Sequence, residues 1–218
     1  YPTTAGAFQP TFGGGVYDMF VTQLDPSQPT AQQHVYTTYL GGTGDESPPS
    51  IQLVPGGLVA VVSWTTSLDF PLSANAFQST RAGSTDCTVT LLDPSAPGAA
   101  QLAYSTYLGG GNDDLAEAVA VSVNGDLVVT GFSDSTNFPV TPGAFDNTPG
   151  GAGSAFVAAL NPFLPAAQQL VYSTYLGGNS STSSNGSDDG RAIAIDDLGR
   201  YVVGGYAESQ SFPTTVGV

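Results

Sequence analysis

Two adjacent carboxylates recur three times along the chain, each time shortly after a Gly-Gly pair. The pairs are Asp45-Glu46, Asp113-Asp114 and Asp188-Asp189. Clustered carboxylates among backbone carbonyls are the oxygen ligands that Ca²⁺ prefers. Asp, Asn and Gly also fill turns without binding metal, because they accept unusual backbone angles. The six side chains are therefore candidate calcium ligands, with ordinary turn positions as the alternative.

Paired carboxylates can also hydrolyse glycosides, but these pairs recur in every unit, whereas an active site is usually single. The chain has three arginines, and their scattered positions do not suggest the arginine cluster of a sialidase-like site. His34 is the only histidine, and Leu102 and Leu170 stand at the equivalent positions, which indicates packing. The only cysteine, Cys87, falls at an apolar strand position. We therefore expect no catalytic site and a non-enzymatic role.

The carboxylate pairs belong to a longer internal period. YTTYLGG begins at Tyr36, and YSTYLGG begins at Tyr104 and again at Tyr172, so both steps are 68 residues (104 − 36 and 172 − 104). A Phe-Pro motif, Tyr-Pro at the first residue, marks the same phase of each unit. We divide the chain, as a single repeat domain, into repeats 1–69, 70–137 and 138–211, with 212–218 starting a further repeat. Such a period indicates a repeat architecture.

Each repeat contains four short segments typical of strands. In the second repeat, 117–123 alternates with a period of two, Asn124-Gly125 predicts a tight hairpin turn, and 127–133 is the return strand. A third strand is expected at 155–160 and a fourth at 170–176, and no segment has a helical period. We expect each repeat to form a four-stranded antiparallel sheet. The predicted fold is all-β, a β-propeller-like array of about three such blades.

The order of these motifs resembles the bacterial SBBP repeat, a β-propeller repeat of exported proteins. The resemblance rests on YSTYLGG, the acidic pair, the NG turn, TGF, FPVTPGAF and the ALNP turn, in that order, over essentially the whole chain. It implies a propeller fold and a secreted or cell-surface setting in a bacterium, and it carries no catalytic residues. The first repeat departs from the pattern where Ser47-Pro48-Pro49-Ser50 opens the first strand, so we expect an irregular edge there.

Three blades do not close a propeller ring, because propellers have about four to eight. We expect the array to be open, or to be completed by other copies of the chain or by further repeats of a longer chain. The chain starts and ends in one phase, and 212–218 could give a neighbour the segment that opens this chain. We expect apolar head-to-tail self-association, which gives a ring or an open filament.

Composition narrows the partners and the setting. The chain has 18 acidic residues, no lysine and a formal net charge of −15, which disfavours nucleic acid and anionic lipid. One cysteine permits no intrachain disulfide, and no apolar run is long enough to enter a membrane. The first residue is Tyr1 rather than Met, so we expect a processed chain or a piece of a longer one. Lysine-free, acidic, Ser/Thr/Gly-rich composition is typical of an exported bacterial protein.

Repeated aromatic residues leave a second function open. They are Trp64, Phe132 and Tyr206 at one repeat position, and Tyr39, Tyr107 and Tyr175 at another. Repeated aromatics are mostly core residues, but they can also form a platform for sugars. The alternative to a structural or adhesive protein is therefore a carbohydrate-binding propeller module with calcium in its acidic loops. A Ser/Asn-rich segment, 179–189, is expected to be a solvated loop with two glycosylation acceptor patterns.

Overall fold

The computed structural model describes residues 2–178 and 187–215, so most of the Ser/Asn-rich segment lies outside the described residues. The described part is all-β. Its strands are β1 Met19–Leu24, β2 His34–Leu40, β3 Ser50–Val54, β4 Leu58–Thr65, β5 Asp86–Leu92, β6 Leu102–Leu108, β7 Asp114–Val121, β8 Leu127–Ser133, β9 Ser154–Leu160, β10 Leu170–Leu176, β11 Asp188–Ile195 and β12 Tyr201–Ala207. The expected strands at 127–133 and 170–176 are confirmed without change.

The strands form four antiparallel sheets. Two sheets have four strands, in the orders β3-β4-β5-β6 and β7-β8-β9-β10, and two have only a pair of strands, β1-β2 and β11-β12. Each four-stranded sheet takes its first two strands from one sequence repeat and its last two from the next. The segments that we expected to form one sheet, 117–123, 127–133, 155–160 and 170–176, do form one, β7-β8-β9-β10, but this sheet crosses the boundary that we placed between repeats 70–137 and 138–211.

The β7–β8 hairpin differs from the turn that we predicted. The ladder ends at the Val121–Leu127 pair, and the Ser122 amide donates to the Asp126 carbonyl at 2.9 Å. Gly125 has a φ of +84°, whereas no other residue type among the described residues has a positive φ. The turn thus needs glycine at one position only, not at both central positions. Val123 lies in this turn and is 99% exposed, so its expected place in the strand is wrong.

Two features of the connections follow from the sequence. The prolines before β3 shorten that strand to 5 residues, against 8 for the equivalent β7, so the irregular edge is confirmed. A short 3-10 helix precedes each of β2, β6 and β10, at η1 Thr30–Gln32, η2 Gly98–Gln101 and η3 Ala166–Gln168. No helix in the described residues is long and apolar enough to cross a membrane.

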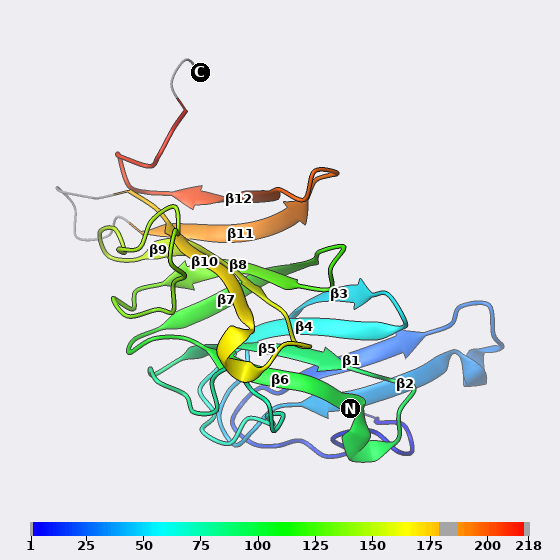
Figure 1. Ribbon diagram of the computed structural model, residues 1–218. Helices are drawn as coiled ribbons and strands as arrows, with labels where there is room; N and C mark the ends of the chain where they lie inside the picture. Colours follow the sequence, from blue (N-terminus) through cyan, green and yellow to red (C-terminus); the bar gives the residue numbers. More distant parts are fainter. Residues whose placement is uncertain (1, 179–186, 216–218) are drawn as a thin grey trace.

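The sheets lie one after another in chain order, with the two small sheets at opposite ends (Figure 1). Apolar side chains fill the space between neighbouring sheets. The largest cluster joins the two four-stranded sheets and includes Val89, Leu127 and Phe156, all fully buried. A second cluster joins the first small sheet to its neighbour through Leu40 and Val61, and a third joins the last one through Ile193. Each sheet is therefore stabilised chiefly by the sheets beside it.

Candidate functional site

In three of the four sheets, a buried carboxylate lies at or just before the first strand. These sheets begin with β3, β7 and β11. Asp114 begins β7 and is fully buried, and its Oδ2 accepts hydrogen bonds from the Ser135 hydroxyl at 2.8 Å and the Gly110 amide at 2.6 Å. The Ser133 hydroxyl donates to Oδ1. This carboxylate therefore ties the end of β8 to the loop that enters the sheet.

Glu46 and Asp188 accept similar hydrogen bonds in the first and third repeats. The hydroxyls of Thr65 and Ser67 both donate to Oε1 of Glu46 at 2.6 Å. Asp188 accepts from the Ser209 hydroxyl at 2.7 Å and the Gly178 amide at 2.8 Å. These three carboxylates occupy equivalent places, so in the third pair the equivalent residue is the first aspartate rather than the second.

The first glycine of the Gly-Gly pair is required by this network. A Cβ added at Gly109 would lie 2.6 Å from Cγ of Asp86 and 2.9 Å from Oδ2 of Asp114. Two carboxyl groups thus face each other across the glycine. Burial raises the pKa of Asp114 to about 6, and the charge of Asp86 adds to the effect. Burial also raises the pKa of Asp86. The site favours the protonated form of at least one carboxyl group.

The first repeat holds the same pair with fewer donors. Burial raises the pKa of Glu46, although its serine and threonine partners oppose the shift, and Asp18 contributes a further rise. Oδ1 of Asp18 and Oε2 of Glu46 are buried and accept no well-formed hydrogen bond within the described residues. Chemically, this pair can hold a proton or a small cation between its two free oxygens.

The other three predicted calcium ligands, Asp45, Asp113 and Asp189, have different partners. Oδ1 of Asp45 accepts from the Val16 amide at 2.5 Å, and Asp113 accepts from the Ser84 hydroxyl. Asp189 forms an ion pair with Arg191 at 2.6 Å. The six predicted residues therefore lie in three separate places, one per repeat. Among the described residues, no group of three or more His, Cys, Asp or Glu side chains is gathered closely enough to hold a metal ion together.

The two residues that we judged structural are both engaged locally. His34 begins β2, is exposed, and its Nε2 lies within hydrogen-bond distance of the Thr37 hydroxyl. Cys87 is fully buried in β5, and burial raises the pKa of its thiol well above the ordinary range. A high pKa disfavours the thiolate, so this cysteine is a poor nucleophile.

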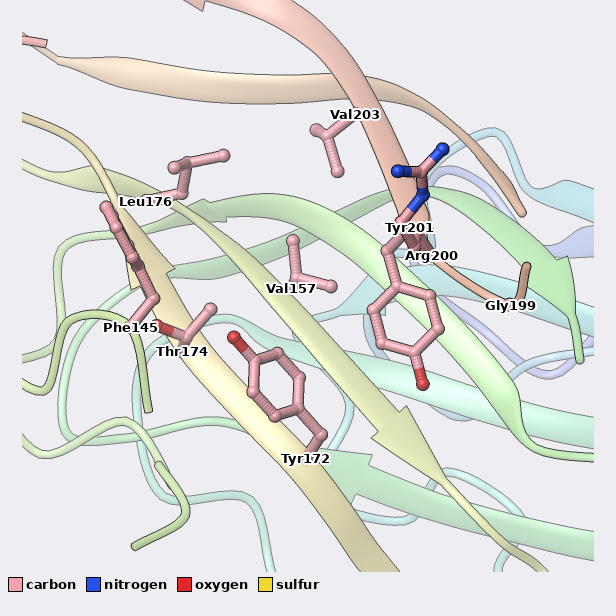
Figure 2. A pocket seen from close by; sticks show the side chains of 9 residues that line it. All are labelled: Phe145, Val157, Tyr172, Thr174, Leu176, Gly199, Arg200, Tyr201 and Val203. Atoms are coloured by element: carbon pink, nitrogen blue, oxygen red, sulfur yellow. The ribbon is translucent and has the colours of Figure 1, made fainter. Parts of the chain in front are cut away.

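One groove lies between the last four-stranded sheet and β12, with a volume of about 620 Å³. Phe145 and Thr174 lie at one end of it and Tyr201 at the other, with Val157 between them (Figure 2). The rings of Tyr172 and Tyr201 are 6.0 Å apart. The groove thus presents aromatic rings and an aliphatic floor.

A second groove, of about 510 Å³, lies at the opposite end of the molecule. It runs between β1 and the start of β3, and its lining includes Phe20, Pro48 and Trp64. Ile51 and Leu53, on β3, are 56% and 70% exposed. The residue equivalent to Ile51 in β7, Val119, is only 6% exposed. The apolar face of β3 is therefore uncovered on this side.

A link between neighbouring sheets was missed by the sequence reasoning. The Tyr36 hydroxyl donates to Oε1 of Gln101 at 2.8 Å, and the Tyr104 hydroxyl donates to Oε1 of Gln169 at 2.7 Å. Each pair spans 65 residues and joins the fourth strand of one sheet to the segment before the fourth strand of the next. A glutamine recurring with the 68-residue period was the signal that could have revealed it.

Comparison with known proteins adds no assignment. No family model matches the sequence, and a search of curated proteins found no match to it.

Proposed function

We propose that this chain is a non-enzymatic, extracellular or cell-surface structural protein, a propeller-like array of SBBP-type repeats that associates with further copies of itself. One observation carries the proposal. The sheets at the two ends each have two strands, whereas the sheets between them have four. The first end has the strands that stand third and fourth in a complete sheet, and the last end has the first and second.

The surface chemistry supports an apolar joint. The chain has 3 arginines and no lysine against 18 acidic residues, so few opposite charges are available between copies. Large apolar side chains are instead exposed at both ends, including Leu24 and Ile51 at one and Val202 and Tyr206 at the other. Exposed apolar patches of this kind recruit a partner.

Solution mass tests the proposal. Analytical ultracentrifugation of the 218-residue chain should give a dimer or larger multiples whose proportion rises with protein concentration. Because two copies of net charge −15 repel each other, added salt should preserve or strengthen the association. A chain that stays monomeric at high concentration, in both low and high salt, would exclude self-association.

The aromatic groove favours a carbohydrate-binding module as the second candidate. Phe145, Tyr172 and Tyr201 line it with apolar rings on which a sugar can stack. A glycan array on the intact chain should then give a signal that is lost in Tyr201→Ala and kept in Tyr17→Ala, an exposed tyrosine at the opposite groove. No glycan signal would leave the structural role as the better proposal.

Calcium belongs to this second candidate. The free oxygens of Asp18 and Glu46 favour the first repeat over the second, where Asp114 is fully supplied with donors. Calorimetric titration with Ca²⁺ should give binding heat that disappears in Glu46→Gln and persists in Asp113→Asn. No heat at millimolar calcium would count against a calcium site.

A further inference from the structure

The two strands at the open ends differ from their internal equivalents in burial. Equivalent positions are 68 residues apart, so β1 corresponds to β5 and β9, and β12 corresponds to β8 at a spacing of 74. All seven residues of β5 and of β9 are buried, whereas only Met19 and Val21 are buried in β1. No residue of β12 is buried, against six of seven in β8. In the described part of the chain, β1 pairs only with β2 and β12 only with β11.

The internal sheets define how these two strands would pair. β4 pairs with β5, and β8 pairs with β9, in one common register in which Val59 faces Leu92 and Leu127 faces Leu160. Applied to the ends, this register places Tyr201 of β12 opposite Leu24 of β1. Gly204 has open space on its side-chain face, but the equivalent Thr130 is fully buried and donates to the Phe156 carbonyl at 2.7 Å.

At each end, one polar side chain also lacks a hydrogen-bond partner that its equivalents in the interior have. Tyr172 corresponds to Tyr36 and Tyr104, whose hydroxyls donate to Gln101 and Gln169, but the Tyr172 hydroxyl has no hydrogen bond within the described residues. At the other end stands Gln33, which corresponds to those two glutamines. Its Nε2 already donates to the Gln28 carbonyl at 3.0 Å, as the Nε2 atoms of the two glutamines do to the matching carbonyls.

Gln33 is therefore oriented like its equivalents, and its Oε1 points to no described donor. Among residues 2–178 and 187–215, no tyrosine stands 65 residues before Gln33, as Tyr36 and Tyr104 do before Gln101 and Gln169. Tyr172 of a second copy can supply the hydroxyl that donates to Oε1 of Gln33.

We propose that the β1–β2 hairpin of one copy docks in the groove beside β12 of a second copy and completes a four-stranded sheet. In this joint β12 of the second copy pairs with β1 of the first, Tyr201 lies opposite Leu24, and the Tyr172 hydroxyl of the second copy donates to Oε1 of Gln33 in the first. The inference rests on the proposed self-association and adds its register. The β11–β12 hairpin of the second copy at the same time covers the exposed Ile51 and Leu53 of the first.

The joint lies on the strands rather than on the terminal segment 212–218 that we first expected. The equivalent place along β2 is already taken by the chain's own start, where the Thr4 amide donates to the Thr37 carbonyl at 3.1 Å and the Gln9 amide to the Thr38 hydroxyl at 2.8 Å. A neighbour's Phe212 to Thr215 would compete for that place. Association should therefore survive deletion of 212–218.

Disulfide trapping tests the register. The proposed pairing sets Val202 opposite Gln23, both exposed, so Gln23→Cys and Val202→Cys should crosslink between copies. The background is Cys87→Ala, since Ala155 occupies the equivalent position in β9. The matched control is Leu24→Cys with Val202→Cys, whose side chains point to opposite faces and cannot reach each other.

The expected result is covalent dimers or larger species from the first pair, with little from the control, and mixed dimers when the two single variants are combined. Sedimentation of the same samples under reducing conditions tests self-association separately from the proposed β12–β1 joint. Association without the specific crosslink, or with equal crosslinking of the control, overturns the joint and leaves self-association standing. A monomer overturns both.

The Tyr172–Gln33 link gives a second test. Tyr172→Phe and Gln33→Leu should each weaken association about tenfold, and together hardly more than either alone, because the two groups share one buried hydrogen bond. The melting temperature of the dissociated Tyr172→Phe variant should stay unchanged, whereas Gln33→Leu also removes the bond to the Gln28 carbonyl within its own chain. The internal counterpart Tyr104→Phe should instead lower the melting temperature. Additive losses from the two end variants, or no loss, would overturn the link.

Discussion

β8 and β12 have equivalent sequences and opposite environments. Both are the second strands of their sheets, and both follow a hairpin with a positive-φ glycine, Gly125 or Gly199. β8 pairs on both edges and packs between two sheets, whereas β12 pairs on one edge only. The difference shows that the local sequence forms the hairpin and that the neighbouring strands and sheets supply most of the burial.

The largest test of this comparison is one leucine at two equivalent positions. Leu160 in β9 is fully buried and Leu24 in β1 is 64% exposed. Leu160→Ala should lower the free energy of unfolding by about 2 to 5 kcal/mol, because it leaves a cavity. Leu24→Ala should change it by less than about 0.5 kcal/mol in the dissociated chain. Urea denaturation at low protein concentration measures both, and equal losses would show that the end sheet is as well packed as the interior.

The pH dependence of stability separates buried carboxyl groups from exposed ones. The pKa of Asp114 rises from 3.8 to about 6 because of burial. The folded chain therefore binds this proton more tightly than the unfolded chain, and the contribution is lost as the pH rises from about 4 to 6, by up to about 3 kcal/mol. Asp114→Asn should flatten this part of the pH profile.

The control for that measurement is Asp25, which is only partly buried and accepts from the Ser27 hydroxyl at 2.6 Å. This hydrogen bond lowers the pKa of Asp25, so its contribution has the opposite sign and is lost as the pH falls. Asp25→Asn should leave the decline between about pH 4 and 6 in place. If Asp114→Asn also leaves it in place, Asp114 does not cause the decline.

Glycine substitutions probe the hairpins that both regions share. Gly125 has a φ of +84°, so Gly125→Val should cost about 1 kcal/mol or more, because a β-branched residue resists this conformation. Chemical denaturation of the variant against the unchanged chain gives the value. An unchanged midpoint would mean that the turn can adopt another conformation.

The smallest expected effect is at the open strand. Gly204 in β12 has no heavy atom within 4 Å of an added Cβ. Gly204→Thr restores the residue that stands at the equivalent position in β8, and it should raise stability by a few tenths of a kcal/mol through strand propensity. The matched Gly205→Thr should destabilise, since its Cβ would lie 1.8 Å from the Asp189 carbonyl oxygen. The order of the two melting temperatures checks the prediction, and a reversed order would contradict the fold of β12.

The period of 68 residues and the alternation of valines were enough to predict the strands of the second repeat to within three residues at each end. These are local signals, because a strand's period of two and its turn residues are written in one short segment. The prolines of the first repeat likewise predicted an irregular edge, which the structure shows as the short β3. The candidate calcium ligands were found as acidic pairs, but their grouping by position was partly misleading, since Asp188 and not Asp189 matches Asp114.

The sequence by itself determined the number and kind of strands, the hairpins and the repeat. The sequence also grouped the four strands that share the sheet β7-β8-β9-β10, whereas only the tertiary structure shows that the end sheets keep two strands each, because that depends on which strands find a partner. The tertiary structure also decided that Asp114 is buried among hydroxyl and amide donors and that Tyr104 reaches Gln169, at 65 residues' distance. Burial and long-range hydrogen bonds arise from the stacking of sheets, which no single repeat specifies alone.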